Sequence, residues 1–257
     1  MNRITHIWSS GLMAAFLLSL AAPLVAQPVE SAKEIVRKAD LHVRGNTSQA
    51  TIIFRIVRPT WSRDMTTKTW SKGNKLAMIR IEAPVKDRGT VYLKREKEVW
   101  NWIPSIERNI KLPPSMMSQS WMGTDFTNDD LVKEFSILED YDHTLVGEEK
   151  IGDRICHIVE LIPKPSAAVV WGKVRIWIDK KDYLQLKGEY FDESGKLVNR
   201  MVTNDIRMLG GRLLPAYMEM LPINKPGQKT VLIYKEIQFD KPIPDHFFTV
   251  ENMKKIQ

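Results

Sequence analysis

Apolar and polar residues alternate along most of this chain, which predicts a protein built mainly of β-strands. In the segment Thr51–Arg58, the residues Ile52, Phe54 and Ile56 fall on one face, and Pro59 closes the run. A period of two gives each such segment one apolar face. The same pattern predicts further strands at Met65–Ser71, Lys75–Glu82, Thr90–Lys94, Glu98–Ile103, Arg154–Ile162, Trp171–Asp179, Gln185–Phe191, Lys196–Met208, Arg212–Leu221 and Lys229–Asp240.

Short turns join many of these predicted strands. Lys72-Gly73-Asn74, Gly210-Gly211 and Pro226-Gly227 each lie between two of them. Strands connected in this way form an antiparallel meander, and a long meander must curl to hide its edges. The sequence therefore predicts a mainly β fold, a large half-open antiparallel β-barrel covered by short α-helices.

A first helix is predicted before the strands. Ser31 and Glu34 have the spacing of a capping box, which satisfies backbone N–H groups at a helix start. Ile35, Val36 and Ala39 then fall on one side, so this helix is amphipathic and lies on something apolar.

A second helix is predicted after Thr127. Asp129 and Asp130 occupy its first turn, where negative charge is favourable. Together with Asp125 and Glu134 they form an acidic cluster, which lacks the glycine and the distal glutamate of a calcium loop. We interpret the cluster mainly as helix capping, with metal binding as the minor alternative.

Residues 1–26 have the pattern of a cleaved secretory signal. Arg3 gives a short basic start, an apolar run extends from Ile7 to Ala22, and the small residue Ala26 stands at the expected cut site. An uncleaved anchor is less favoured, because a span needs ~20 mostly apolar residues. We expect an exported, soluble protein with a single domain over residues 27–257.

Charge and cysteine content narrow the function. Lys and Arg number 38 against 31 Asp and Glu, a formal net charge of +7. In an exported protein this excess favours anionic lipid headgroups or acidic protein surfaces over nucleic acid, and solubility alone is the third interpretation. Because Cys156 is the single cysteine, no internal disulfide is possible and the core must provide the stability.

The sequence carries no recognisable catalytic motif. The five histidines are scattered and form no His-Glu-x-x-His pair, and neither a Gly-x-Ser-x-Gly elbow nor a phosphate-binding glycine loop is present. Carboxylates distant in sequence can still meet in a fold, so this absence favours binding without disproving catalysis. We expect no enzymatic activity, and a hydrolase of envelope lipids is the least favoured hypothesis.

A segment rich in methionine and aromatic residues follows Pro113-Pro114 and interrupts the strands. Flexible methionine side chains suit a surface that accepts varied apolar shapes. Two interpretations stay open, a lid over an apolar cavity and a loop that plugs one end of the barrel. The candidate ligand-binding residues are Met116, Met117, Trp121, Met122 and Phe126 in the lid, and Ile52, Phe54, Ile56, Trp100 and Trp102 in the strands.

Longer motifs indicate a family. They are RGTVYL at 88–93, WNWIP at 100–104, LPPSM at 112–116, QSWMGTDFTNDDL at 119–131 and IPDHFFTV at 243–250. With these motifs the chain resembles the bacterial outer-membrane lipoprotein-sorting proteins, the LolA-like family, within an uncharacterised branch that carries the 119–131 block. The resemblance covers essentially the whole mature chain.

This resemblance implies a periplasmic carrier with no cofactor. Acyl chains of lipoproteins or other lipids would occupy an apolar cavity and travel towards the outer membrane. The implied partners are an inner-membrane lipid exporter and an outer-membrane acceptor, with no nucleic acid, and the alternative is a periplasmic sensor or adaptor of a lipid exporter. In true LolA an arginine inside the barrel holds the lid shut, and four residues are candidates for it here: Arg55, Arg58, Arg63 and Arg80.

Overall fold

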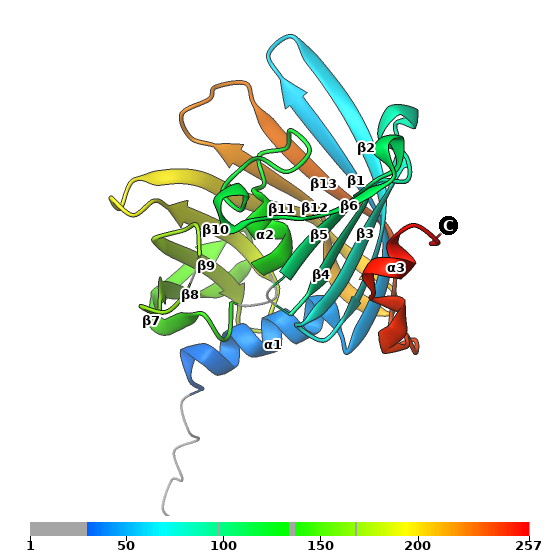
Figure 1. Ribbon diagram of the computed structural model, residues 1–257. Coiled ribbons are helices and arrows are strands. Elements are labelled where there is room, and N and C mark those ends of the chain that lie inside the picture. The colour runs from blue at the N-terminus through cyan, green and yellow to red at the C-terminus, as the bar shows by residue number, and fades with distance from the viewer. Residues whose placement is uncertain (1–29, 97, 134–136, 168, 257) are drawn as a thin grey trace, which may run out of the picture.

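One strongly curved antiparallel sheet forms the body of the protein (Figure 1). The structure is a computed structural model that describes residues 30–96, 98–133, 137–167 and 169–256. The strands are β1 (Thr47–Arg58), β2 (Trp61–Lys72), β3 (Leu76–Ala83), β4 (Val91–Arg95), β5 (Glu98–Ile103), β6 (Arg108–Lys111), β7 (Tyr141–Ile151), β8 (Arg154–Pro163), β9 (Lys173–Asp179), β10 (Gln185–Phe191), β11 (Leu197–Leu209), β12 (Arg212–Pro222) and β13 (Lys229–Phe239).

Short helices complete the described chain. They are α1 (Ala32–Arg44), α2 (Asn128–Lys133) and α3 (Val250–Met253), with the 3-10 turns η1 (Val85–Asp87), η2 (Pro104–Ile106), η3 (Pro114–Met116) and η4 (Asp245–Phe247).

The strand order runs β6-β5-β4-β3-β2-β1-β13-β12-β11-β10-β9-β8-β7. Each strand pairs with the next one along the chain except β6 and β7, and β1 also pairs with β13, which joins the two halves. The strands β6 and β7 stand at the two ends of this order, so the sheet curls without closing. The predicted half-open antiparallel barrel with short helices is confirmed.

Two strands and one helix were not predicted. All four residues of β6 are exposed, and β7 is mostly exposed with an irregular register between Leu145 and Gly147. An edge strand with both faces in water has no need for alternation, so the period-two signal is absent there. The helix α3 is a single turn, too short for a periodic pattern.

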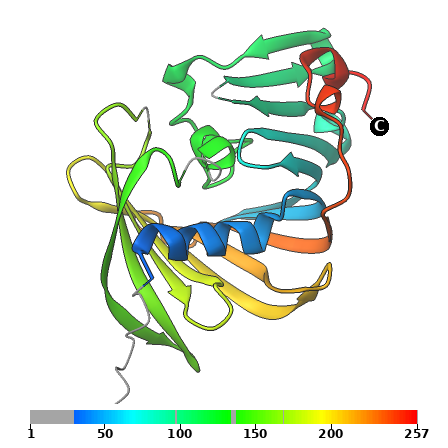
Figure 2. The same ribbon diagram turned by 90° about the horizontal axis from the view of Figure 1, so that it is seen from below.

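Helix α1 covers the concave side of the sheet (Figure 2). The predicted cap is present, because the N–H of Glu34 donates to the Ser31 hydroxyl at 3.2 Å. The apolar residues Ile35, Val36 and Ala39 are buried against the strands. Gly45, at φ 67°, ends the helix and leads into β1.

The C-terminal segment covers part of the outer face (Figure 1). Phe248 and Met253 are buried with Met78 and Leu93 from β3 and β4. This part of the sheet is therefore apolar on both faces. Within the described residues, no helix combines the length and apolarity of a membrane span, and the predicted signal at residues 1–26 lies outside them.

Replacing Phe248 by alanine tests the outer packing. Phe248 is fully buried, so Phe248→Ala should lower the free energy of unfolding by about 3–5 kcal/mol. Val85→Ala is the matched control, because this side chain is 78% exposed, and it should change stability by less than about 0.5 kcal/mol. Urea denaturation measures both, and equal midpoints would contradict the docking of the C-terminal segment.

Candidate functional site

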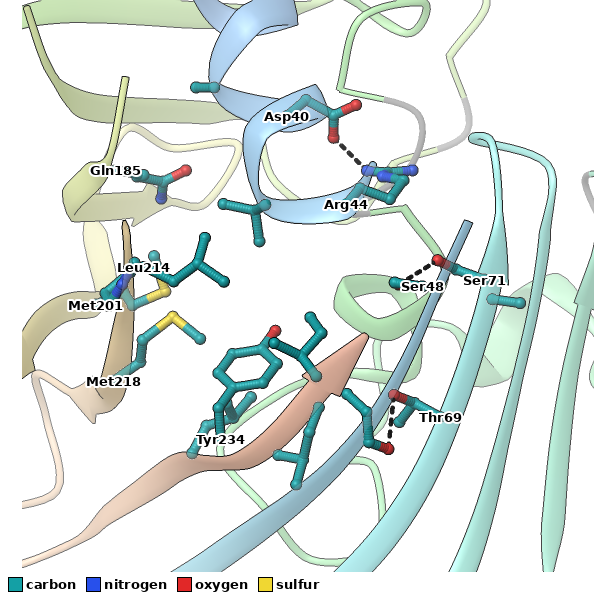
Figure 3. A pocket seen from close by; sticks show the side chains of 18 of the residues that line it. Asp40, Arg44, Ser48, Thr69, Ser71, Gln185, Met201, Leu214, Met218 and Tyr234 are labelled. Atoms are coloured by element: carbon teal, nitrogen blue, oxygen red, sulfur yellow. Dashed lines mark hydrogen bonds and ion pairs between the residues drawn. The ribbon is translucent and has the colours of Figure 1, made fainter. Parts of the chain in front are cut away.

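An apolar cavity of about 200 Å³ lies between α1 and the concave face of the sheet (Figure 3). Strand residues of one alternating face form its floor and walls, and α1 forms its roof. The apolar lining comes from Val36, Ala39, Val43, Ala50, Ile52, Phe54, Ala77, Ile79, Ile176, Ile178, Met201, Leu214, Met218, Leu232, Tyr234 and Ile237, among others.

Two of the predicted cavity residues line this space. Ile52 and Phe54 share a face of β1 and lie opposite Tyr234 and Leu232 of β13. Ile56 lies on the same face and is fully buried, but it falls beyond the end of the cavity. The sequence analysis did not name the wall residues of β11, β12 and β13. The alternation of apolar residues in these predicted strands could have indicated them.

Trp100 and Trp102 lie on the opposite side of the sheet. They pack against the C-terminal residues on the outer face and do not line the cavity. Their spacing shows that they share a face, but a period of two does not say which face points inward. The neighbouring residue Val99 faces inward, where it contacts Leu112.

The predicted lid, residues 116–126, fills the end of the barrel away from α1, and we call it the plug segment. Trp121 is 1% exposed and meets the Phe54 ring edge-on, with ring centroids 5.0 Å apart. Phe126 contacts the same ring at 6.1 Å. Met116 and Met117 are half-buried beside the cluster of Val99 and Leu112. The plug segment thus stands behind Phe54, and no residue of it lines the cavity.

Met122 has a positive backbone φ of 50°. Its side chain contacts Tyr92. Its sulfur accepts a hydrogen bond from the Tyr92 hydroxyl at 3.2 Å. Burial, and secondly the charge of Asp87, raises the pKa of Tyr92 to about 12, so the hydroxyl keeps the proton that it donates.

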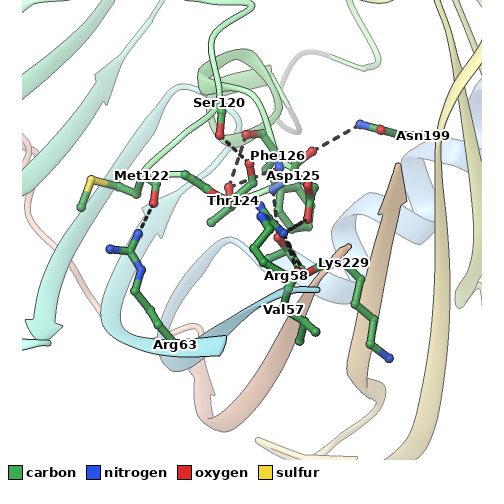
Figure 4. Close-up of polar contacts among 12 residues, drawn as sticks. Val57, Arg58, Arg63, Ser120, Met122, Thr124, Asp125, Phe126, Asn199 and Lys229 are labelled. Carbon is green, nitrogen blue, oxygen red and sulfur yellow. Dashed lines mark hydrogen bonds and ion pairs between the residues drawn. The ribbon is translucent and has the colours of Figure 1, made fainter. Parts of the chain in front are cut away.

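Two arginines from β1 and β2 hold the plug segment (Figure 4). Arg58 donates from Nη1 to Asp125 Oδ2 at 3.0 Å and from Nη2 to the Gly123 carbonyl at 2.7 Å. Arg63 donates from Nη2 to the Met122 carbonyl at 2.6 Å. The Arg58–Asp125 pair is largely buried, so loss of either partner would leave an uncompensated charge.

The other two candidate arginines bind elsewhere. Arg55 pairs with the exposed Asp64, and Arg80 pairs with Glu82. Neither contacts the plug segment through a hydrogen bond or ion pair recorded for the described residues. The hydrogen bonds therefore identify Arg58 and Arg63 as the two candidate arginines that contact the plug segment, a distinction that the sequence did not make.

Asp125 also connects the plug segment to the middle of the sheet. Its carboxylate accepts from the Thr230 hydroxyl at 2.7 Å, and its backbone N–H donates to the same hydroxyl oxygen at 2.9 Å. The Asn199 side chain donates to the Asp125 carbonyl at 3.3 Å. One residue thus ties the segment to β1, β11 and β13.

Of the remaining acidic residues, Asp130 caps α2 as predicted, whereas Asp129 Oδ2 accepts from the backbone N–H of Val170 at 3.2 Å. The Thr127 N–H donates to Asp130 Oδ2 at 2.7 Å, and the Asp130 N–H donates to Thr127 Oγ1 at 3.0 Å. Asp130 also accepts from the Trp171 indole at 2.7 Å, and burial raises its pKa. Glu134 lies outside the described residues, and no group of three metal-ligating side chains occurs within them.

Charged side chains reach the cavity at one place, the last turn of α1. Asp40 and Arg44 form an ion pair there, beside the paired hydroxyls of Ser48 and Ser71, which are 2.7 Å apart (Figure 3). Burial raises the pKa of Asp40. The rest of the described lining carries no charged side chain.

Lys94 is buried close to this pair. Its Nζ donates to the Asn74 carbonyl at 2.8 Å, and 6% of the residue is exposed. Burial, followed by repulsion from Arg44, lowers the pKa of Lys94 to about 7.

Known proteins share the fold of this chain. The model of a family described as uncharacterised matches residues 73–255. The chain superposes on a DUF1329 family protein from Desulfovibrio piger with a TM-score of 0.79 and 21% identity, covering 86% of this chain and 97% of that one. A search of curated proteins gave no match.

Two further solved structures are similar. A LolA superfamily protein from Nitrosomonas europaea has a TM-score of 0.75 and 25% identity, covering 86% of this chain and 99% of that one. A domain assigned as an outer membrane lipoprotein-sorting protein from Vibrio parahaemolyticus has a TM-score of 0.76 and 19% identity, covering 87% and 98%.

Replacing Trp121 by alanine tests the plug. Because Trp121 is 1% exposed and belongs to the core, Trp121→Ala should lower the free energy of unfolding by about 3–5 kcal/mol in urea denaturation. Trp61→Ala is the control, because Trp61 is 50% exposed, and it should cost less than about 1 kcal/mol. A loss for Trp121→Ala no larger than that of the control would indicate a segment that is not packed.

Lys94 predicts a pH dependence of stability. Between pH 7 and pH 9 the folded state binds fewer protons than the unfolded state, because the pKa of Lys94 is lowered to about 7 from 10.5. The free energy of unfolding should therefore rise with pH in this window, by up to about 1.4 kcal/mol per pH unit. Lys94→Met should flatten this rise, whereas the exposed control Lys75→Met should keep it, since Lys94 is still present. An unchanged slope in Lys94→Met would refute the assignment.

Proposed function

We propose that this chain is a periplasmic carrier of lipid or lipoprotein acyl chains. It belongs to the LolA-like family, described as uncharacterised, whose model matches residues 73–255. The chain has the fold of the lipoprotein-sorting proteins. The proposal adds the ligand, the compartment and the direction of transport, and it includes no catalytic step.

The apolar cavity under α1 is the observation that carries this proposal. Most of its lining is aliphatic, methionine and aromatic side chains, with a few hydroxyl and amide groups, and among the described lining residues charge is confined to the Asp40–Arg44 pair. An acyl chain that crosses water needs such cover, because burial contributes ~0.8 kcal/mol per CH₂ and on the order of 10 kcal/mol for one long chain.

We assign the plug segment as the lid of this cavity. Phe54 lines the cavity on one side and contacts Trp121 and Phe126 on the other. Movement of the plug segment would therefore expose the cavity end at Phe54, and the bonds from Arg58 and Arg63 oppose that movement. In this proposal the two arginines latch the lid until delivery.

The proposed route begins with export by the signal at residues 1–26. An inner-membrane lipid exporter would supply the cargo, and an outer-membrane acceptor would receive it. Native mass spectrometry of protein purified without detergent, with lipid extraction alongside, tests the carrier function. A bound lipid or lipopeptide is expected. An empty protein that also takes up no fluorescent fatty acid would contradict the proposal and favour a sensor or adaptor.

A cavity-filling substitution localises the binding site. Met218 lines the cavity and is partly buried, so Met218→Trp should occupy ligand space and weaken fluorescent fatty-acid binding by at least about tenfold, at a stability cost of about 1–3 kcal/mol. Ile155→Trp is the control, because Ile155 is 54% exposed and does not line the cavity. Equal affinity of both variants would place the ligand elsewhere.

A further inference from the structure

Four neighbouring turns form one rim of the barrel, at the end away from α1 (Figure 1). They join β5 to β6, β3 to β4, β1 to β2 and β12 to β13, which stand next to one another in the sheet. We call these turns, together with the first residues of β2 and β6, the rim: residues 104–108, 84–89, 59–62 and 223–228.

Contacts make the rim continuous. A side chain on Gly89 would meet the Pro104 ring at 3.3 Å, and one on Gly227 would meet the Pro59 ring at 3.7 Å. Arg63, beside the β1–β2 turn, has Nη1 at 3.9 Å from Asp87 Oδ2. Each turn therefore touches or pairs with the next.

Every one of these turns presents one large apolar side chain to solvent. Val85 is 78% exposed, Ile106 53%, Trp61 50% and Ile223 41%. Apolar residues spaced along one rim indicate a surface that another apolar phase covers.

Basic residues stand among these apolar side chains. Lys86, Arg88, Arg108 and Lys225 are exposed, whereas Glu107 is the one exposed acidic residue of the rim. Exposed apolar groups interleaved with Lys and Arg are the composition of protein surfaces that lie in the headgroup layer of anionic membranes.

We propose that the rim docks on an anionic membrane surface, with Val85, Ile106 and Trp61 entering the interface and the basic residues contacting lipid phosphates. This inference goes beyond the carrier function, and its test uses no cargo, so either can fail without the other.

The rim also contacts both arginines that hold the plug segment. The guanidinium carbon of Arg58 lies 6.0 Å from the centroid of the Trp61 ring, and Arg63 faces Asp87 in the β3–β4 turn. Docking that draws Trp61 and this turn into the interface changes the surroundings of both arginines. Membrane contact thereby loosens the plug segment at the place where cargo would leave.

Vesicle flotation tests the docking. The protein should bind vesicles that contain phosphatidylglycerol at least about tenfold more tightly than phosphatidylcholine vesicles, with binding that falls as salt rises. Equal binding to both vesicle types, or no binding, overturns the proposal.

Substitutions locate the surface. Val85→Asp with Ile106→Asp should reduce binding by at least about tenfold, and Lys86→Gln with Arg88→Gln and Arg108→Gln should remove the preference for phosphatidylglycerol, at roughly fivefold per residue. The control is Ile155→Asp with Met208→Asp, which changes exposed apolar residues outside the rim and should keep full binding. A control that loses as much as the rim variant overturns the assignment. All these side chains are exposed, and thermal melting verifies that each variant is folded.

Hydrogen exchange tests the coupling to the plug. Anionic vesicles should speed exchange of the backbone amides of residues 119–128 several-fold in the wild type and leave it unchanged in Val85→Asp with Ile106→Asp. Unchanged exchange in a wild-type protein that is bound to vesicles overturns the coupling.

Discussion

A curved sheet that does not close leaves its concave apolar face without a partner, and other parts of the chain must cover that face. Helix α1 covers it at one end, and the plug segment covers it at the other. Neither element fills the space between them, and the cavity is what remains. The cavity therefore follows from the architecture and from the limited size of its two covers.

The two covers are held differently. Helix α1 buries an apolar face, is joined to β12 by a hydrogen bond from His42 Nε2 to the Leu213 carbonyl at 2.8 Å, and continues into β1 through Gly45. The plug segment has apolar anchors too, but its backbone is held by arginines and by Asp125. A packed face separates only at the cost of exposing apolar area, whereas ion pairs and hydrogen bonds exchange partners with water or a charged surface. In our proposal the plug segment is the cover that responds to a membrane, because Arg58 and Arg63 bond its backbone and lie beside the rim.

Charged side chains are distributed differently in the cavity and on the rim. Among the described residues, charged side chains line the cavity only at the last turn of α1, where Asp40 and Arg44 form an ion pair. The rim instead exposes its basic residues among apolar side chains. An interior that is nearly free of charge suits acyl chains, and a basic apolar rim suits the lipid surface from which they come or to which they go.

The sequence by itself determined every strand except β6 and β7, the capping of α1 and α2 and the half-open barrel, because alternation and caps are local patterns. It also indicated the Met-rich segment and two true wall residues, Ile52 and Phe54. Only the tertiary structure decided which face of each strand points inward, because β3 to β5 are apolar on both faces once the C-terminal segment packs outside them. It alone selected Arg58 and Arg63, whose partners lie about sixty residues away along the chain and become neighbours only when the sheet curls.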